Sequence, residues 1–331
     1  MDEKDLNPGK IMGIAGGYWQ AFALHAAVKL DLFTRIGSDR LTADEVAARL
    51  GGDGRGCASL LNGLAAMDLL EKADGRFACT SLSSKFLSRE SPSYLGHIIT
   101  HHYHLVDSWH HLDESVLSGK PNRHKSSIRG DEEREAFLMG MFNAAMMQAP
   151  QTVRQIDLSG RRLLLDLGGG PGTWAIHFCL QNPGLKATLF DLPATLPFAE
   201  KTISRFGLSE RIRFQGGDYV KDDFGEGYDV AWLSQILHAE GPETCRALVR
   251  KAMSSLLPGG LLLIHEFILN NDMAGPLMPA LFSLNMLCGT EAGRSYSERQ
   301  ITEMMAEAGA RDIRRLPLRS PLESGILAGT K

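Results

Sequence analysis

From Arg161 onward, short apolar runs of strand character alternate with stretches of helical periodicity, and this alternation severely restricts the possible folds. Strands are predicted over residues 162–167, 187–190, 212–215, 228–233, 261–267, 313–318 and 325–328. Helices are predicted over 172–181, 196–206, 242–256 and 297–308. Such alternation predicts an α/β fold with a doubly wound, seven-stranded and mostly parallel sheet. Ligands of these sheets bind beyond the carboxyl ends of the strands, so functional residues are expected just after each strand.

The loop after the first predicted strand is rich in glycine and contains Gly168, Gly169, Gly170 and Gly172. Glycine lets the backbone approach a ligand closely and accepts positive φ. A nicotinamide dinucleotide site needs Gly or Ala at the last position of G-x-G-x-x-G, where Thr173 stands, and no P-loop lysine follows. The spacing therefore favours a nucleoside without a pyrophosphate and argues against a nicotinamide oxidoreductase.

Acidic residues follow the next two predicted strands. Asp191 lies 23 residues after Gly168, close to the offset of roughly 20 residues at which dinucleotide folds place a ribose-binding acid. After the third strand come Gly217, Asp218 and Tyr219, where the carboxylate is placed to accept from an adenine amino group and the phenol ring to stack on the base. Each acid alone also suits a turn or a helix cap, but the three features together indicate a nucleoside site.

Before residue 160 the chain is predicted to be mostly helical. Apolar residues recur at three- and four-residue steps over 11–34, and a further helix is predicted over 55–70. Between them, Thr42 and Glu45 form a capping-box pattern that predicts the start of a short helix. Residues 71–80 predict a β-ribbon. Helix, turn, helix and ribbon together are a winged-helix pattern.

The charge of this segment argues against nucleic-acid binding. The helix that would enter a groove carries Arg55 and Asp68 and almost no other charge, and the whole chain has a net charge of −4. Groove readers need Arg, Lys, Asn or Gln directed at base edges. The segment is therefore predicted to be a packing module whose apolar helix face makes the protein a homodimer.

Six of the eleven histidines fall within residues 97–111. His97, His101 and His104 would share one helix face, but only Asp107 is near enough to complete a ligand set. No metal site is therefore predicted, and the cluster is interpreted as the lining of a polar pocket or as a solvated surface.

The remaining composition argues against a membrane protein, a secreted protein and a fold held by zinc or disulfides. No apolar run approaches the roughly 20 residues of a membrane helix, and the N-terminal residues have no apolar signal core. The five cysteines are scattered and form no CxxC pair, which argues against a structural zinc site and a disulfide framework. We therefore expect a cytoplasmic protein without a membrane segment.

At this point the chain resembles a known family. The segments LLLDLGGGPGTWA, LFDLP, GGDYV, LSQILH and LLLIHEF are similar to those of class I S-adenosylmethionine-dependent methyltransferases. They resemble most the O-methyltransferases that include caffeate, flavonoid and hydroxyindole enzymes, over nearly the whole chain. The resemblance implies a Rossmann-like catalytic domain over 161–331, a winged-helix dimerisation domain over 1–95, and a helical connector over 96–160 that contributes to the acceptor pocket.

The family comparison implies S-adenosylmethionine as the cofactor and S-adenosylhomocysteine as the product. The methionine part would lie on the loop from Asp166 to Gly172, the ribose at Asp191 with Leu192, and the adenine at Gly217, Asp218 and Tyr219. Ser234 joins the implied cofactor residues, at a position where some members have a lysine.

The resemblance also implies the catalytic residues. His238 occupies the place of the family's general base, and Glu266 that of the acid that orients it. This suits the chemistry, because a phenol with a pKa of about 10 must lose a proton during transfer and a histidine is a suitable base. The sequence departs from the plant pattern at Ala239 and Glu240, where plant members have Asp and Trp.

A second plant acid would align with a glycine, and Glu291, two residues earlier, is the candidate replacement. Two segments rich in methionine and aromatic residues correspond to the family's acceptor pocket, although ordinary helix core is an alternative interpretation. The predicted acceptor residues are Phe142, Met146, Phe282, Asn285 and Met286.

The sequence thus predicts an enzyme that methylates an oxygen of a hydroxylated aromatic small molecule. The departures around the base leave open a C-, N- or S-methyltransferase on the same scaffold. A winged-helix regulator with a vestigial cofactor site is a third possibility, disfavoured because such a protein would not need both His238 and Glu266.

Overall fold

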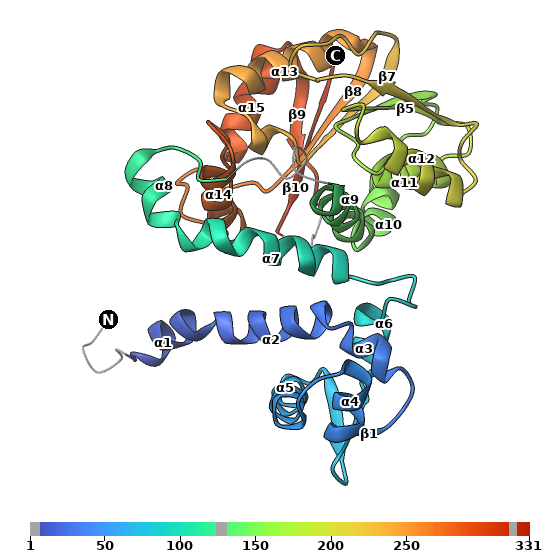
Figure 1. The fold of residues 1–331 in the computed structure, drawn as a ribbon. Coiled ribbons are helices and arrows are strands. Elements are labelled where there is room, and N and C mark those ends of the chain that lie inside the picture. The colour runs from blue at the N-terminus through green and yellow to red at the C-terminus, as the bar shows by residue number, and fades with distance from the viewer. Residues whose placement is uncertain (1–6, 124–130, 318–322) are drawn as a thin grey trace. The chain divides into compact units, whose positions relative to one another are not determined.

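The computed structural model describes residues 7–123, 131–317 and 323–331, and of residues 131–132 only the backbone (Figure 1). The chain divides into two compact units, Met1–His104 and Leu105–Lys331.

The N-terminal unit combines short helices with a small sheet of order β1-β3-β2. Its elements are α1 (Gly9–Gly16), α2 (Tyr18–Lys29), α3 (Leu32–Ile36), β1 (Leu41–Thr42), α4 (Ala43–Leu50), α5 (Gly54–Ala66), β2 (Leu70–Ala73), β3 (Arg76–Cys79) and α6 (Ser81–Leu87). The Thr42–Glu45 capping box is present at the start of α4. Helices α4 and α5 with the β2–β3 ribbon form the predicted winged-helix pattern, closed by a core around Phe33, Leu61 and Leu64.

Two helix predictions in this unit were wrong in their extent. The helix predicted over 11–34 is interrupted at Gly17, where a pair of glycines lowers helix propensity, and again at Asp31, which adopts φ 53°. The helix predicted to reach residue 70 ends at Ala66, because Asp68 turns the chain with φ 57° into β2.

The second unit begins within α7 (Gly96–His110) and continues through helices into a seven-stranded sheet. The connecting helices are α8 (Leu112–Ser118), α9 (Asp131–Met146), α10 (Ala149–Thr152) and η3 (Val153–Gln155). The strands are β4 (Leu163–Leu167), β5 (Lys186–Asp191), β6 (Ile212–Gly216), β7 (Tyr228–Ser234), β8 (Leu256–Glu266), β9 (Arg311–Arg315) and β10 (Gly325–Thr330). The helices among them are α11 (Thr173–Gln181), α12 (Leu196–Arg205), η4 (Leu237–Ala239), α13 (Pro242–Ser255), α14 (Leu277–Gly289) and α15 (Glu298–Glu307).

The strand order β6-β5-β4-β7-β8-β10-β9 confirms the predicted doubly wound sheet. The five strands from β4 to β8 run parallel, and β10 is antiparallel to both its neighbours. The chain moves from β4 outward through β5 to β6 and then returns to add β7 on the other side of β4. This reversal makes the carboxyl edge of β4 and β7 the switch point at which such sheets bind ligands.

Strands β4, β5 and β7 and the second half of β8 are buried on both faces, which explains their nearly continuous apolar sequences. One face packs on α11 and α12 through Trp174 and Phe178, and the other on α13 and α15 (Figure 1). β8 begins five residues earlier than predicted, and α14 occupies a stretch predicted only as an acceptor segment. Within the described residues, no helix is long and apolar enough to cross a membrane.

Candidate active site

The glycine-rich loop between β4 and α11 packs closely against the residues beneath it at the switch point. A side chain at Gly172, which has φ 86°, would place its Cβ 2.9 Å from Cδ1 of Ile203. A Cβ at Gly169 would lie 2.9 Å from both Leu189 and the carboxyl carbon of Asp166. At Gly170 nothing lies within 4 Å of the Cβ position. Gly169 and Gly172 thus have no room for a side chain, whereas the space beside Gly170 is open. We call this open space at Gly170 the cradle, because it leaves room for a ligand.

Asp166 lies near the end of β4, beneath this loop, with 1% of its surface exposed. Its Oδ2 accepts a hydrogen bond from the Ala175 amide at 3.0 Å, while its buried Oδ1 has no partner within the described residues. Burial, helped by the nearby Asp191, raises the pKa of the carboxyl to about 7. A buried carboxyl with an unused oxygen fits a cationic or hydrogen-bond-donating ligand group.

Asp191, at the end of β5, holds the loop in place. Its Oδ2 accepts from the Gly170 amide and its Oδ1 from the Leu192 amide, both at 2.7 Å. Burial raises the pKa of this carboxyl, and the two amides oppose the shift. The acid therefore fixes the loop and also borders the open side of the cradle at Gly170.

The end of β6 brings Gly217, Asp218 and Tyr219 to the same edge, but the side chains of Asp218 and Tyr219 have partners of their own. The Asp218 carboxylate pairs with Lys221 at 3.0 Å, and this contact lowers its pKa. The Tyr219 hydroxyl donates to Oε1 of Glu240 at 3.1 Å. Burial raises the pKa of the Tyr219 hydroxyl well above its usual value, and the Glu240 carboxylate adds to the shift.

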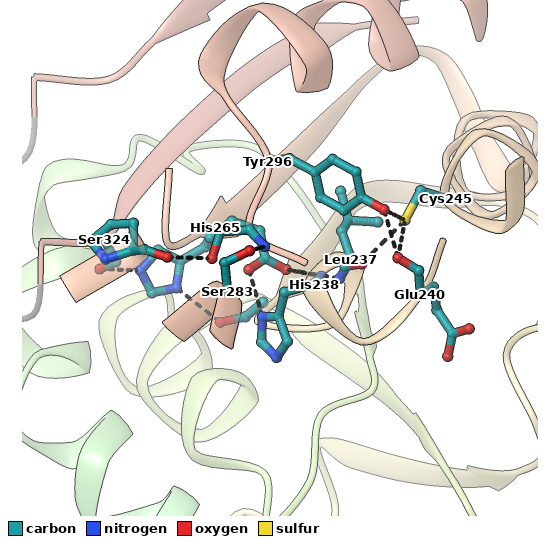
Figure 2. Close-up of polar contacts among 12 residues, drawn as sticks. Leu237, His238, Glu240, Cys245, His265, Ser283, Tyr296 and Ser324 are labelled. Carbon is teal, nitrogen blue, oxygen red and sulfur yellow. Dashed lines mark hydrogen bonds and ion pairs between the residues drawn. The ribbon is translucent and has the colours of Figure 1, made fainter. Parts of the chain in front are cut away.

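The structure brings His238 and Glu266 into direct contact at the ends of β7 and β8 (Figure 2). Nδ1 of His238 lies 2.8 Å from Oε2 of the buried Glu266. Oε1 of Glu266 accepts from the amide of Leu237 at 2.8 Å. Because a carboxylate can only accept, the proton of the neutral imidazole is on Nδ1 and the lone pair is on Nε2. This is the arrangement of an oriented general base.

Two aromatic rings border the imidazole. Phe282 of α14 meets His238 edge-on at 4.8 Å between ring centroids, and Phe267 lies 4.6 Å from Phe282 and 6.4 Å from His238. Phe282 was among the predicted acceptor residues, whereas Phe267 was not. The apolar surface next to the base is suited to a flat ring.

The other predicted acceptor residues are more dispersed. Asn285 is buried in α14, where its Oδ1 accepts from Trp109 at 3.3 Å, and Met286 is buried beside it. The Met146 sulfur lies 3.2 Å from Nε2 of His177, and Phe142 is half-buried on the same helix, α9. Their contact with an acceptor stays a prediction.

Glu291 is exposed, and no polar contact joins it to His238 within the described part of the chain. The position of the plant acid, Gly293, lies against the backbone of the base: a Cβ there would be within 2.4 Å of the His238 carbonyl oxygen. No side chain fits at that place without a shift of η4. A catalytic part for Glu291 stays a prediction.

Sequence reasoning missed Gln235, which follows β7 with φ 58°. Both polar atoms of its side-chain amide are buried and have no partner within the described residues. Its position just after the predicted strand 228–233, in the segment LSQILH, was the available signal. Within the described residues, no three His, Cys, Asp or Glu side chains are placed to hold a metal ion.

Comparisons with known proteins identify the family. Residues 109–311 match the model of the O-methyltransferase domain, and residues 12–89 that of the O-methyltransferase dimerisation domain. The chain is 32% identical to 3-hydroxy-5-methyl-1-naphthoate 3-O-methyltransferase of Streptomyces sahachiroi, covering 98% of this chain and 95% of the relative. It is 29% identical to L-tyrosine C(3)-methyltransferase of Streptomyces lavendulae, covering 93% and 88%.

Among solved structures, human N-acetylserotonin methyltransferase in complex with S-adenosylmethionine superposes with a TM-score of 0.89, at 26% identity and 100% and 99% coverage. The chain therefore belongs to the O-methyltransferase family, with the class I methyltransferase fold. It is an enzyme that uses S-adenosylmethionine. The open cradle at Gly170, the unused oxygen of Asp166 and the unpartnered amide of Gln235 fit a nucleoside that carries an amino acid.

The raised pKa of Asp166 leads to a prediction about proton release. Below its pKa of about 7 the carboxyl is mostly protonated. We expect the ammonium group of a bound S-adenosylhomocysteine to lie beside this carboxyl, where it favours the charged form and lowers the pKa. Binding of S-adenosylhomocysteine at pH 6.5 should therefore release a large fraction of a proton. Calorimetry in two buffers of different ionisation enthalpy measures this release, which Asp166→Asn should abolish. Equal release by wild type and variant would contradict this position for the ammonium group.

Proposed function

We propose that the enzyme transfers the methyl group of S-adenosylmethionine to a hydroxyl oxygen of an aromatic small molecule, with His238 as general base. The observation that carries this proposal is the contact between Nδ1 of His238 and the buried Glu266, beside the rings of Phe267 and Phe282. The bound cofactor supplies an activated methyl group on a sulfonium. The protein must then orient the acceptor and remove its proton.

The proposed cofactor residues all lie at or just after the carboxyl ends of strands. Asp166 would accept from the ammonium group, the backbone of Gly168, Gly169, Gly170 and Gly172 would border the methionine part, and Asp191 with Leu192 would bind the ribose. Gly217, Asp218 and Tyr219 would border the adenine, with Ser234 and Gln235 at the end of β7. The support is the open loop and the unpartnered polar atoms described above.

His238 would take the acceptor's proton on Nε2. Once both ring nitrogens carry protons, the imidazolium is stabilised by Glu266, whose Oε2 already accepts from Nδ1. Because Oε1 of the same carboxylate is bonded to the Leu237 amide, the acid keeps its place while the charge on the ring changes. Proton transfer thus needs no rearrangement of the pair.

The acceptor is proposed to be a flat hydroxylated ring. Phe267 and Phe282 provide an aromatic surface at the base, and the predicted residues Phe142, Met146, Asn285 and Met286 would form the rest of its pocket. The name of the Streptomyces sahachiroi relative describes a hydroxynaphthoate that is methylated on oxygen, which supports this class of acceptor.

A carbon acceptor is the second candidate, because the relative from Streptomyces lavendulae is named as a C-methyltransferase of tyrosine. A ring carbon next to a phenol becomes nucleophilic when the phenol loses its proton, so the same base would serve. Mass spectrometry of the product separates the two, since a methyl ether and a ring methyl fragment differently.

The N-terminal unit is proposed to form a homodimer. The matched dimerisation domain covers residues 12–89, and α1 and α2 expose Ile11, Ile14, Tyr18 and Trp19. We propose domain boundaries of 1–95, 96–160 and 161–331, because the small sheet ends before the first boundary and β4 begins after the last.

Replacing His238 tests the catalytic proposal. With labelled S-adenosylmethionine and a panel of hydroxylated naphthoates and indoles, His238→Asn should lower turnover by roughly 100- to 10,000-fold. Binding of S-adenosylhomocysteine should stay close to wild type. Glu266→Gln should also lower turnover, because it weakens stabilisation of the imidazolium. The exposed His110→Asn is the matched control. Unchanged turnover in His238→Asn would contradict the proposal.

Replacing Trp19 tests the dimer. Its side chain is 69% exposed in the single chain, and a charge at the centre of an apolar interface is strongly unfavourable. Trp19→Glu should therefore shift the mass measured by light scattering from dimer toward monomer. Leu117→Glu, at an exposed position on α8, should leave it unchanged. A wild-type protein that is a monomer at micromolar concentration would refute the proposed assembly.

A further inference from the structure

A chain of buried polar side chains crosses one face of the large sheet beside the proposed site (Figure 2). Oγ of Ser234, at the end of β7, lies 2.9 Å from Nδ1 of His265 on β8. Nε2 of His265 lies 2.8 Å from Oγ of Ser324, just before β10. Ser324 donates in turn to Oε1 of Gln148, in the link between α9 and α10, at 3.3 Å.

His265 stands in a place where the sheet otherwise has apolar residues. It directly follows the apolar run Leu261–Ile264 and is 2% exposed. Its ring stacks on Trp232 with centroids 5.5 Å apart and meets Trp174 edge-on at 5.0 Å. A polar side chain in such a core is tolerated only when its polar atoms are satisfied, and both ring nitrogens of His265 are. Its packing alone does not need the nitrogens.

The direction of the hydrogen bonds follows from the last link. Ser324 has one hydroxyl hydrogen, and it donates that hydrogen to Gln148. The Ser324 oxygen is therefore the acceptor toward His265, so Nε2 carries the proton of the ring. Nδ1 is then an acceptor, and the hydroxyl of Ser234 must be the donor to it. Burial lowers the pKa of His265 to about 4, so the ring is neutral at pH 7.

Ser234 lies at the carboxyl edge, next to Gln235, whose amide atoms are buried without partners in the described chain. A serine hydroxyl has one hydrogen and two lone pairs. With its hydrogen committed to Nδ1 of His265, Ser234 can offer a ligand only lone pairs. A free serine would instead rotate and present either a donor or an acceptor.

We propose that His265 is a positioning residue, fixed in one tautomer by Ser324 and Gln148, which holds the Ser234 hydroxyl as a hydrogen-bond acceptor for a donor group of the cofactor. The inference rests on the proposed cofactor role of Ser234. His265 contacts neither cofactor nor acceptor and acts through Ser234 alone. The donor group is a hydroxyl, an ammonium or an amino group.

Calorimetric titration with S-adenosylhomocysteine tests this with variants that separate the two ring nitrogens. His265→Phe keeps a ring between Trp174 and Trp232 and removes both nitrogens, and should weaken binding by about tenfold. His265→Asn places an amide oxygen near the position of Nδ1 and should recover most of the affinity. His265→Gln places its amide near Nε2, restores only the Ser324 contact and should not.

A double-mutant cycle isolates the route through Ser234. Ser234→Ala should weaken binding about as much as His265→Phe, and His265→Phe in the Ser234→Ala background should cause no further loss. Additive losses, equal rescue by Asn and Gln, or wild-type affinity in His265→Phe would overturn the proposal. Thermal melting identifies variants that do not fold. If His265→Phe is one of them, the comparison of His265→Asn with His265→Gln decides.

The wild-type titration keeps this inference distinct from the proposed function. A wild-type protein that does not bind S-adenosylhomocysteine would contradict the assigned cofactor site as a whole. A wild type that binds and methylates, with His265 variants of unchanged affinity, would contradict the role of His265 alone.

Discussion

The buried carboxylate of Glu266 fixes the centre of the site by holding both the backbone and the side chain of the neighbouring loop. One oxygen accepts from the Leu237 amide and the other from the His238 imidazole, each at 2.8 Å. A carboxylate with 2% exposure is strongly destabilised unless donors surround it, so the loop after β7 must bring its amides and ring to this point. The orientation of His238, the proposed base, is therefore a consequence of how the buried carboxylate is satisfied.

The sheet places Glu266 where it can accept hydrogen bonds from the loop after β7. β7 and β8 run parallel with Ser234 opposite His265, so the residues that follow both strands leave the sheet together. The order of strands around β4 brings Asp166, Asp191 and Asp218 to the same edge, although more than 50 residues separate the first from the last. The proposed cofactor residues and the proposed base are thus neighbours because the chain reverses direction at β4.

Local patterns in the sequence were sufficient to predict much of the fold and part of the candidate site. The glycine loop, the acids after each strand and the Thr42 cap depend on spacing and strand ends, which a single sequence displays. The pairing of His238 with Glu266 was predicted from the resemblance to the family. The interruption at Asp31 and the end of α5 at Ala66 depend on single backbone conformations that apolar periodicity does not encode. The hydroxyl contact from Tyr219 to Glu240 and the His265 chain join distant segments, so no local pattern predicts them.

The tautomer of His238 tests its proposed role as general base most directly. Nuclear magnetic resonance of protein labelled with nitrogen-15 at histidine distinguishes a protonated ring nitrogen from one that carries a lone pair, and His238→Asn identifies the signals. In the S-adenosylhomocysteine complex at pH 8, we expect the neutral ring to carry its proton on Nδ1 and its lone pair on Nε2. A proton on Nε2 would contradict the proposed role of His238, because the nitrogen proposed to face the acceptor could not then act as a base.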